Sequence, residues 1–491
     1  PQPQWGQPQP QWGQPAWGMP PPKRRNPAAI VIPIVLVLAL VGLGVAIWLL
    51  ALDDAVEWDP EIKVLADFVE SERGLKFEKA VAVEYLSEEE WDADAGDTSG
   101  LTDDDIEDLD DSLVFLRAIG LAEGDPDLVD QLGDFTSDAY VGYYSPVDKR
   151  IRVRGEFAGE LPVELKATLV HELTHALQDQ HFDLDNIWGD PEADNAFAVQ
   201  ALIEGDASNV ENGYVADLSS ADFDALSESY EAYEGETSNF DIPVGIEVSS
   251  FAPYALGPGF AQAIDSVGAG ELNHAFRLTP GSDEHVFDPL SYINGDEPRD
   301  VETPEISESA DEVDSGTFGA LGFFIMLSER IDPHQAMRAT DGWGGDAYVQ
   351  YREGDTNCVR IRYFGDTETD LTEMHDALTA WIGSLPTPFA KVVREGDYLD
   401  FESCDPGPDV LLRTGKAIDA IALPLVRSEI MGVVADEGAS AEEADCFANR
   451  VVEDSTFEEL ADSDHAKWSS PEWDTRSTVL AGECFAESDA I

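Results

Sequence analysis

"LVHELTHALQDQHFD", residues 169–183, places two histidines four positions apart around a glutamate. Leucine and alanine recur at helical spacing through this stretch and just before it, so we expect one helix over 161–182. Positions four apart lie on the same side of a helix, so His171 and His175 can direct their imidazoles at one cation. Glu172 is rotated about 100° around the helix axis. It can therefore accept a proton beside that cation as a general base.

A catalytic zinc site needs a third protein ligand and an open fourth position. No further histidine follows at a suitable spacing, so we look for a carboxylate on a second helix. The stretch ALIEGDA offers Glu204, with apolar residues just before it. Glu192 and Asp194 are rivals in the preceding loop, and Glu204 itself can be read as a surface residue of an acidic helix. The expected ligands of Zn²⁺ are His171, His175 and Glu204.

Several polar residues near these ligands are candidates for orienting the histidines by hydrogen bonds to their far ring nitrogens. They are Asp206, Ser208 and Asn209 on the second helix and Asp179 one turn beyond His175. We expect His181 to be an ordinary polar residue at the helix end.

The charge of the chain is extreme: 101 acidic residues against 28 lysines and arginines give a net charge of −73 over 491 residues. Such a chain repels nucleic acid and anionic lipid, so we expect no nucleic-acid partner. A heavily hydrated surface, suited to high salt, explains the acidity. Calcium binding is the alternative, but DDDIEDLDD at 103–111 lacks the residue order of a calcium loop. We expect that stretch to be the solvated face of a helix.

The N-terminal region predicts a membrane anchor. Residues 1–27 are a Pro-, Gln-, Trp- and Gly-rich tail without a means of forming a core. The uncharged run 28–52 is long enough to span a bilayer as a helix. Lys23, Arg24 and Arg25 precede the run, so we expect the tail in the cytoplasm and the remainder outside the cell. A cleaved signal peptide is the alternative. The tail could recruit a cytoplasmic partner.

The rest of the chain predicts an α+β fold in three parts. We expect a metallopeptidase-like domain over 53–300, an α+β domain over 301–405 and a helical segment over 406–491. The four cysteines lie in the last third of the chain, in surroundings that we expect to be oxidising. Of three possible connectivities we favour the sequential one, Cys358–Cys404 and Cys446–Cys484.

A hairpin is predicted over YVGYYSPVDKRIRVRG, residues 140–155. Its second strand places Arg150, Arg152 and Arg154 on one face. We expect an edge strand, whose arginines either prevent aggregation and balance nearby carboxylates or receive an extended peptide. We also expect an acidic, turn-rich stretch over 213–250, followed by two helical stretches over 257–278.

The motifs described so far resemble those of the gluzincins, zinc metallopeptidases with a thermolysin-like core. Closer still are predicted membrane-anchored or secreted proteins of actinobacteria and haloarchaea, which share VHELTHALQDQHFDL, ALIEGDA, PGSDEHVFDPLSY (280–292) and GWGGDAYVQY (342–351). The likeness covers roughly 60–390. It implies a zinc-peptidase core, Glu172 as the base, and a substrate-side edge strand in the hairpin that ends at Arg154.

The chain also departs from the thermolysin pattern. Ser208 stands where an aspartate is usual, four residues beyond the third ligand, so Asp206 or Asn209 would have to replace it. The group that stabilises the oxyanion is open among the candidates Tyr254, His274 and His285.

The resemblance implies a membrane-anchored, extracellular zinc endopeptidase with a protein or peptide substrate. The main alternative is a surface binding module that keeps the gluzincin fold and the metal but has lost activity. A structural ectodomain without metal is a third reading, which would leave the two histidines and Glu204 without a purpose.

Overall fold

The computed structural model describes residues 57–155, 157, 160–188, 193–237, 242–460 and 470–485. The expected tail over 1–27 and the expected membrane span over 28–52 lie outside these residues. Among the helices that are described, none has both the length and the apolar character that a bilayer crossing requires. The described part of the chain mixes helices with two sheets, so the α+β class is confirmed.

A small sheet near the start of the chain supports the helix that carries the histidines. Its strands are β1 (Ala82–Leu86), β2 (Gly142–Ser145) and β3 (Arg150–Arg154), in the order β1-β3-β2. Ile151 and Val153 of β3 are fully buried and share a core cluster with Leu169 and Leu173 of α6 (Val163–Phe182). The helix α2 (Pro60–Arg73) packs on the same cluster. The predicted histidine helix is therefore confirmed and has a rigid base.

The expectation that the second hairpin strand is an edge strand is wrong. β3 pairs with β1 in parallel and with β2 in antiparallel fashion, so it lies in the middle of the sheet. Its arginines form ion pairs with carboxylates: Arg150 with Glu84, Arg152 with Asp148, and Arg154 with Glu88 at the start of α3 (Glu88–Ala95). Balancing these carboxylates is the role that the structure gives the arginines. The strands with a free edge in this sheet are β1 and β2.

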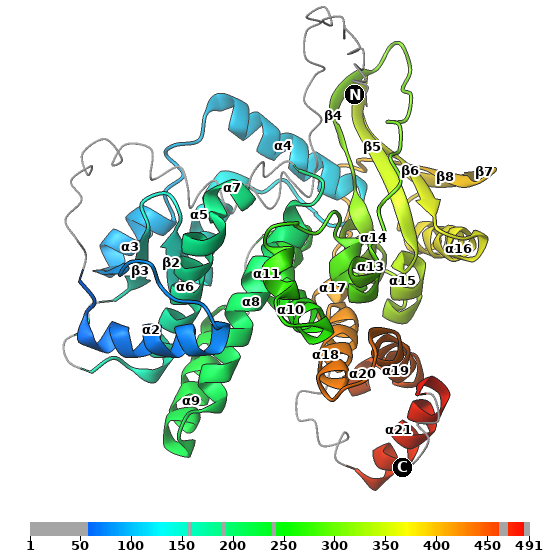
Figure 1. The fold of residues 1–491 in the computed structure, drawn as a ribbon. Coiled ribbons are helices and arrows are strands. Elements are labelled where there is room, and N and C mark those ends of the chain that lie inside the picture. The colour runs from blue at the N-terminus through cyan, green and yellow to red at the C-terminus, as the bar shows by residue number, and fades with distance from the viewer. Residues whose placement is uncertain are drawn as a thin grey trace, which may run out of the picture.

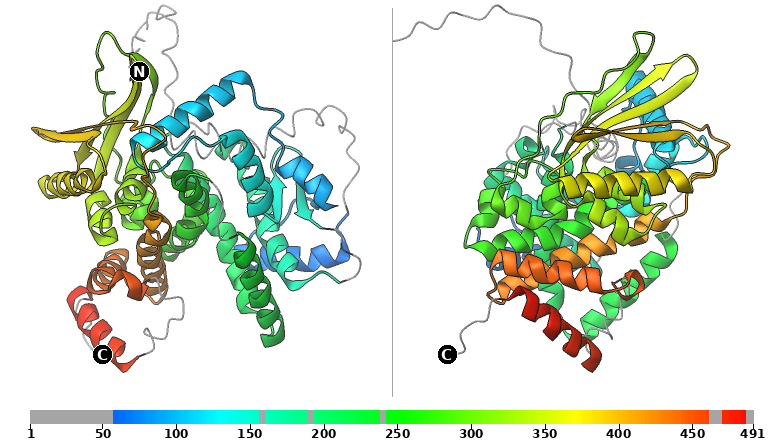
Figure 2. Two further views of the ribbon diagram at one scale, coloured as in Figure 1. Left: turned by 180° about the vertical axis from the view of Figure 1, so that it is seen from behind. Right: turned by 90° about the vertical axis from the view of Figure 1, so that its right-hand side faces the viewer.

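Two long helices occupy the middle of the molecule, between the two sheets (Figure 1; Figure 2, left). They are α8 (Ala196–Ala216) and α10 (Val244–Val267). They approach most closely at Gly205 and Gly257: a Cβ built on Gly205 would lie 2.1 Å from the backbone of Gly257. Only glycine at both positions allows this approach.

One expectation for this region is wrong and another is met only in part. The stretch over 213–250 is not turn-rich, because it contains the helix α9 (Ser220–Thr237) and the start of α10. Among the described side chains of α9, those of residues 220–230, only Leu226 is buried, so the sequence of this part shows no apolar stripe. The two helical stretches expected over 257–278 are present, but the first belongs to α10, which already begins at Val244 and continues through Pro253 and Pro258.

The larger sheet is antiparallel and has the order β4-β5-β6-β8-β7. Its core is continuous with that of the central helices and includes Phe323, Tyr363 and Trp381. The same cluster contains residues from each of the three expected domains. The strands are β4 (Asp311–Gly316), β5 (Trp343–Glu353), β6 (Thr356–Gly365), β7 (Ala390–Glu395) and β8 (Tyr398–Cys404), and the helices beside them are α14 (Gly319–Ser328), α15 (Pro333–Thr340) and α16 (Glu368–Ser384).

Helices connect and extend these units (Figure 2, right). In α4, most of the acidic stretch 103–111 is exposed, as expected for a solvated helix face. The connecting helices are α4 (Asp103–Ala118), α5 (Leu128–Ala139), α7 (Leu184–Ile187), α11 (Glu271–Ala275), α12 (Glu284–Phe287) and α13 (Pro289–Asn294). The C-terminal helices are α17 (Lys416–Ala420), α18 (Ala422–Asp436), α19 (Ala441–Asp454), α20 (Phe457–Leu460) and α21 (Pro471–Cys484).

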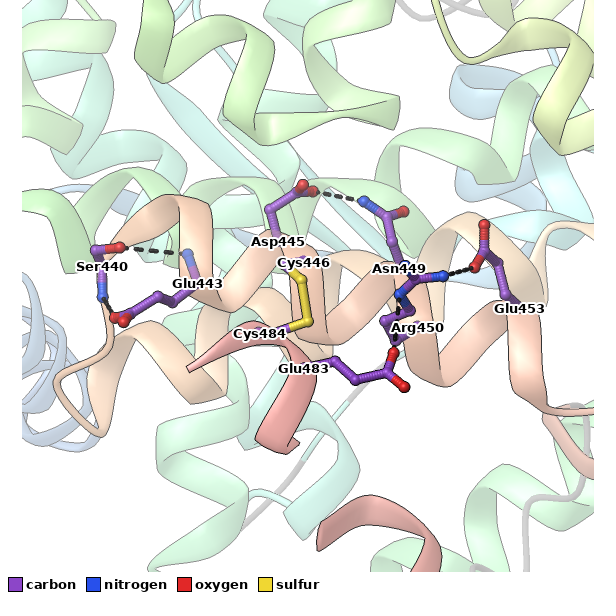
Figure 3. Close-up of a disulfide and its surroundings, with 9 residues drawn as sticks. All are labelled: Ser440, Glu443, Asp445, Cys446, Asn449, Arg450, Glu453, Glu483 and Cys484. Atoms are coloured by element: carbon purple, nitrogen blue, oxygen red, sulfur yellow. Dashed lines mark hydrogen bonds and ion pairs between the residues drawn. A yellow bond between two sulfur atoms is a disulfide. The ribbon is translucent and has the colours of Figure 1, made fainter. Parts of the chain in front are cut away.

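Both favoured disulfides are confirmed. Cys358 and Cys404 are directly opposite each other on β6 and β8. Cys446 and Cys484 join α19 to α21 (Figure 3). Beside this second bridge, Arg450 forms ion pairs with carboxylates of both helices. The last helix is thus held to the body of the protein by a covalent bond as well as by charge.

Candidate metal centre

The two histidines of α6 and the glutamate of α8 meet in the interior of the protein. The Nε2 atoms of His171 and His175 each lie 3.2 Å from the same carboxylate oxygen of Glu204. One ligand atom from each residue lies within 4.8 Å of the other two, and all three side chains are buried. Within the described ranges, no other group of histidine, cysteine and carboxylate side chains meets this condition. The group predicted from the sequence can therefore hold a metal ion.

A second glutamate on α8 orients His171. Oε2 of Glu211 lies 3.2 Å from Nδ1 of His171, and the Tyr230 hydroxyl on α9 donates to the other oxygen of Glu211. A carboxylate only accepts hydrogen bonds, so the proton of a neutral His171 ring stands on Nδ1. Nε2 also faces a carboxylate oxygen, that of Glu204, so a cation that displaces the proton from Nε2 would find the lone pair of this nitrogen directed at it.

His175 is oriented by a chain of side chains that crosses three helices. Nε2 of Gln178 donates to the Ile203 carbonyl at 3.1 Å and to Asp206 at 2.8 Å, and Arg73 of α2 forms an ion pair with Asp206 at 2.7 Å. Both partners of Gln178 are acceptors, so its amide nitrogen must face them. Its Oε1 atom therefore faces Nδ1 of His175, 3.0 Å away. This arrangement fixes the tautomer in which Nε2 is free to bind metal.

The electrostatics of the group favour a cation in its centre. Burial acts to raise the pKa of Glu204, but the two imidazoles lower it to about 2. Burial acts to lower the pKa of His171, but hydrogen bonds to Glu204 and Glu211 raise it well above its ordinary value. The pKa of His175 is raised in the same way, against burial, by the charge of Glu204. The carboxylate thus stays ionised and the rings attract positive charge.

Glu172 lies next to the ligands without belonging to them. Its side chain is buried, and burial raises the pKa of its carboxyl although the neighbouring imidazoles lower it. The backbone N–H of Tyr144 on β2 donates a hydrogen bond to it. Glu172 therefore stands between the metal-binding group and the free edge strand of the small sheet.

Tyr254 of α10 contacts both Glu204 and His171. Its hydroxyl forms a hydrogen bond with Glu204, and its ring stacks on that of His171 with 6.1 Å between centroids. Burial, followed by the charge of Glu204, raises the pKa of Tyr254 well above its ordinary value, so the hydroxyl keeps its proton. Gly205 directly follows Glu204, and Gly257 lies three residues after Tyr254. The close contact between the two glycines therefore brings Tyr254 near Glu204.

The other sequence candidates lie elsewhere. Asp179 accepts from the Tyr144 hydroxyl and from Lys149, and not from either of the two histidines. Asn209, His181 and His285 each contact a backbone carbonyl, those of Pro258, Lys76 and Asp296 respectively. His274 is exposed, and Asp194 lines a separate cavity. Glu192 lies outside the described residues.

Of the predicted orienting residues, Asp206 acts through Gln178 and not directly. Gln178 and Glu211 were not predicted as orienting residues. A signal existed for both: Gln178 follows His175 by three positions, and Glu211 follows Glu204 by two helical turns, on the same face.

Comparison with known proteins adds little to the metal centre. A family described as a domain of unknown function (DUF8575) matches residues 306–400, which hold most of the larger sheet. No curated protein and no solved structure matches the chain. The matched segment begins after the last residue of the metal centre, so the site must be interpreted from its own geometry.

Proposed function

We propose that this protein is a zinc-dependent endopeptidase of the gluzincin type, anchored in the membrane by residues 28–52 and facing outwards. The observation that carries the proposal is the convergence of two imidazoles and a carboxylate from separate helices, with Glu172 beside them. A protein that only stored or sensed a metal would have no need for an additional buried carboxylate at this point.

The donor set fits zinc. Two neutral imidazole nitrogens and one carboxylate oxygen are typical of catalytic zinc sites that keep a fourth position open. A bound zinc ion would supply Lewis acidity, which polarises a peptide carbonyl and lowers the pKa of a water molecule. His171, His175 and Glu204 would hold the ion, and Gln178 and Glu211 would keep the two rings in the required tautomer.

In this proposal Glu172 transfers the protons. It would accept a proton as water attacks the scissile carbonyl and later deliver that proton to the leaving amine. The N–H of Tyr144 holds the carboxylate in place. Tyr254 is the best placed of the three oxyanion candidates, because its protonated hydroxyl already lies at the ligand group, whereas His274 and His285 lie elsewhere.

The substrate strand would bind at β2 and not at β3. β2 is an edge strand of the small sheet, and its Tyr144 contacts the proposed base. An extended peptide that pairs with this edge would place a carbonyl group next to Glu172. The arginines of β3 are engaged by carboxylates, so they give no reason to expect an acidic peptide.

The proposal is tested by Glu172→Gln in the full-length protein, with Glu164→Gln on the first turn of the same helix as the matched control. We expect both variants to retain zinc by elemental analysis. Glu172→Gln should cleave a peptide library at least about 100-fold more slowly, because general-base catalysis typically contributes 10²- to 10⁴-fold. Mass spectrometry of the digests measures the rates.

Cleavage by Glu172→Gln at the rate of the parent would contradict the assignment of the base. A parent protein that holds zinc yet cleaves no peptide in the library would instead support the alternative, a surface binding module that has lost activity.

A further inference from the structure

An exposed aromatic side chain lies beside the metal centre. Phe251 is on α10, three residues before Tyr254, so the two side chains lie on the same side of that helix. Tyr254 contacts Glu204 and His171. Residues three apart on a helix have Cβ atoms about 5–6 Å apart. Phe251 is therefore a close neighbour of the group that can hold a metal ion.

The exposure of Phe251 is unusual for its helix. α10 buries most of its apolar side chains, among them Val248, Ala252 and Leu256, whereas Phe251 is 38% exposed. The other large apolar side chain of α10 that is exposed, Val267, is the last residue of the helix. Apolar surface in contact with water is unfavourable. Aromatic side chains that line a concave site are common where a ligand covers them.

A buried ring holds Phe251 in place. Phe135 of α5 meets it edge to face, with 5.8 Å between the ring centroids and 77° between the ring planes. Phe135 itself is buried in the core cluster of the central helices. Edge-to-face contacts favour one orientation of the two rings. Phe251 therefore presents a fixed apolar surface to solvent.

The helix that carries Phe135 leads directly to the edge strand β2. α5 ends one residue before Tyr140, which is already extended, and β2 begins two residues after it. Side chains two apart along an extended chain point to the same side, so Tyr140 shares a face with Gly142 and Tyr144. That face is directed at α6, because the Tyr144 hydroxyl donates to Asp179. Burial is the main cause of the raised pKa of Tyr254, and the nearby phenol of Tyr140 contributes to it.

Phe251 thus lies between the two features that the proposed function assigns to the substrate, the metal-binding group and the free edge of β2. A peptide that pairs with β2 and places a carbonyl group at the metal-binding group must pass this phenylalanine. Side chains of an extended peptide alternate between its two sides. One residue near the scissile bond would therefore turn its side chain towards α10 and contact the exposed ring.

We propose that Phe251 determines the specificity of the site by selecting a substrate with a large apolar residue close to the scissile bond. This specificity presupposes the proposed peptide hydrolysis. An apolar side chain would bury its own surface and that of Phe251, whereas a charged one would lose hydration against the rings without gaining a partner. Glu247, one turn before Phe251, is already paired with Arg413 at 3.1 Å, so it gives no reason to expect a basic residue there.

The test measures the binding of short blocked alanine peptides, one of alanine alone and the others with a single phenylalanine at each position in turn. Isothermal titration calorimetry uses the full-length Glu172→Gln variant, so that peptides are not cleaved during the measurement. We expect the best phenylalanine peptide to bind at least about tenfold more tightly than the alanine peptide, because burial of this side chain is favourable by at least that factor.

Variants in the same background assign this preference to one residue. Phe251→Ala should reduce it to about threefold or less, and Phe251→Leu should retain most of it, because an apolar surface remains. Phe223→Ala, at an exposed phenylalanine of α9, is the matched control and should leave the preference unchanged. Zinc content and thermal unfolding that match the background in all three variants would exclude a general loss of structure.

A preference for phenylalanine that survives Phe251→Ala would overturn the assignment, and so would equal binding, or no binding, of all the peptides. In the protein with Glu172 intact, mass spectrometry of the digests should show phenylalanine next to the cleaved bond, and Phe251→Ala should abolish this bias. Failure of the proposed hydrolysis gives a different result: the parent would cleave none of the peptides, while the difference in binding would still depend on Phe251.

Discussion

The closest contact between the central helices makes a sharp prediction for Gly205→Ala. In an ordinary helix interior, replacing glycine by alanine stabilises the protein by up to about 1 kcal/mol. At this position the new Cβ would lie 2.1 Å from the carbonyl carbon and oxygen of Gly257. These are backbone atoms that cannot rotate away, so α8 and α10 must move apart.

Overpacking of a core typically costs about 1–3 kcal/mol. A backbone clash belongs at the upper end of that range. After the gain in helix propensity is subtracted, we expect Gly205→Ala to lower the free energy of unfolding by about 2 kcal/mol. The shift also separates Glu204 from Tyr254, so zinc affinity should fall as well.

Gly213→Ala on the same helix is the matched control. Its Cβ would meet only the end of the flexible Glu72 side chain, at 3.3 Å. This variant should keep or raise stability by a few tenths of a kcal/mol, up to about 1. Urea unfolding of both variants, with metal removed, measures the difference. If Gly205→Ala proved as stable as Gly213→Ala, the close approach of α8 and α10 would be disproved.

Three further changes probe other parts of the structure. Gln178→Ala should weaken zinc binding about 10- to 100-fold, because His175 loses its orienting partner, and an unchanged affinity in a chelator competition would argue against that role. Burial raises the pKa of Asp346 to about 7, against about 3.9 when unfolded. As pH rises, the carboxyl therefore loses its proton at a lower pH in the unfolded chain than in the folded protein. Between about pH 4 and about pH 7, the free energy of unfolding of the parent should fall relative to that of Asp346→Asn. An equal pH dependence of the two unfolding free energies would contradict this. Replacing Cys358 and Cys404 by serine removes a cross-link between two positions 46 residues apart. The free energy of unfolding, measured with a chemical denaturant, should fall by about 4 kcal/mol. An unaltered midpoint would show that the bridge does not constrain the unfolded chain.

The sequence was sufficient to predict the group that can hold a metal ion, because the geometry of its two histidines is local. His171 and His175 share one helix face by spacing alone, and Glu204 was identified by requiring a carboxylate on the next helix. The orienting residues were harder to find. Asp206 acts on His175 only through Gln178, and the arginine that holds Asp206 comes from α2, more than a hundred residues away in the chain.

The errors in the fold have the same physical origin. The hairpin signal of β2 and β3 was clear, but the parallel partner of β3 is β1, which precedes it by more than sixty residues. Such a partner leaves no mark on the local pattern, so β3 looked like an edge. In α9, residues 220–230 contain a single buried apolar side chain, which is too little to show a period. In α10, two prolines mimic a helix boundary although tertiary packing maintains the helix.

The link between α9 and the metal centre has a consequence for how this protein can change over time. Tyr230 lies in the largely exposed segment 220–230 of α9, yet its hydroxyl reaches Glu211 and, through it, His171. If the group binds an ion as proposed, surface substitutions on α9 can adjust how firmly that ion is retained while the buried packing of α8 against α10 stays intact. Metal retention and folding would then be separable traits, open to independent selection.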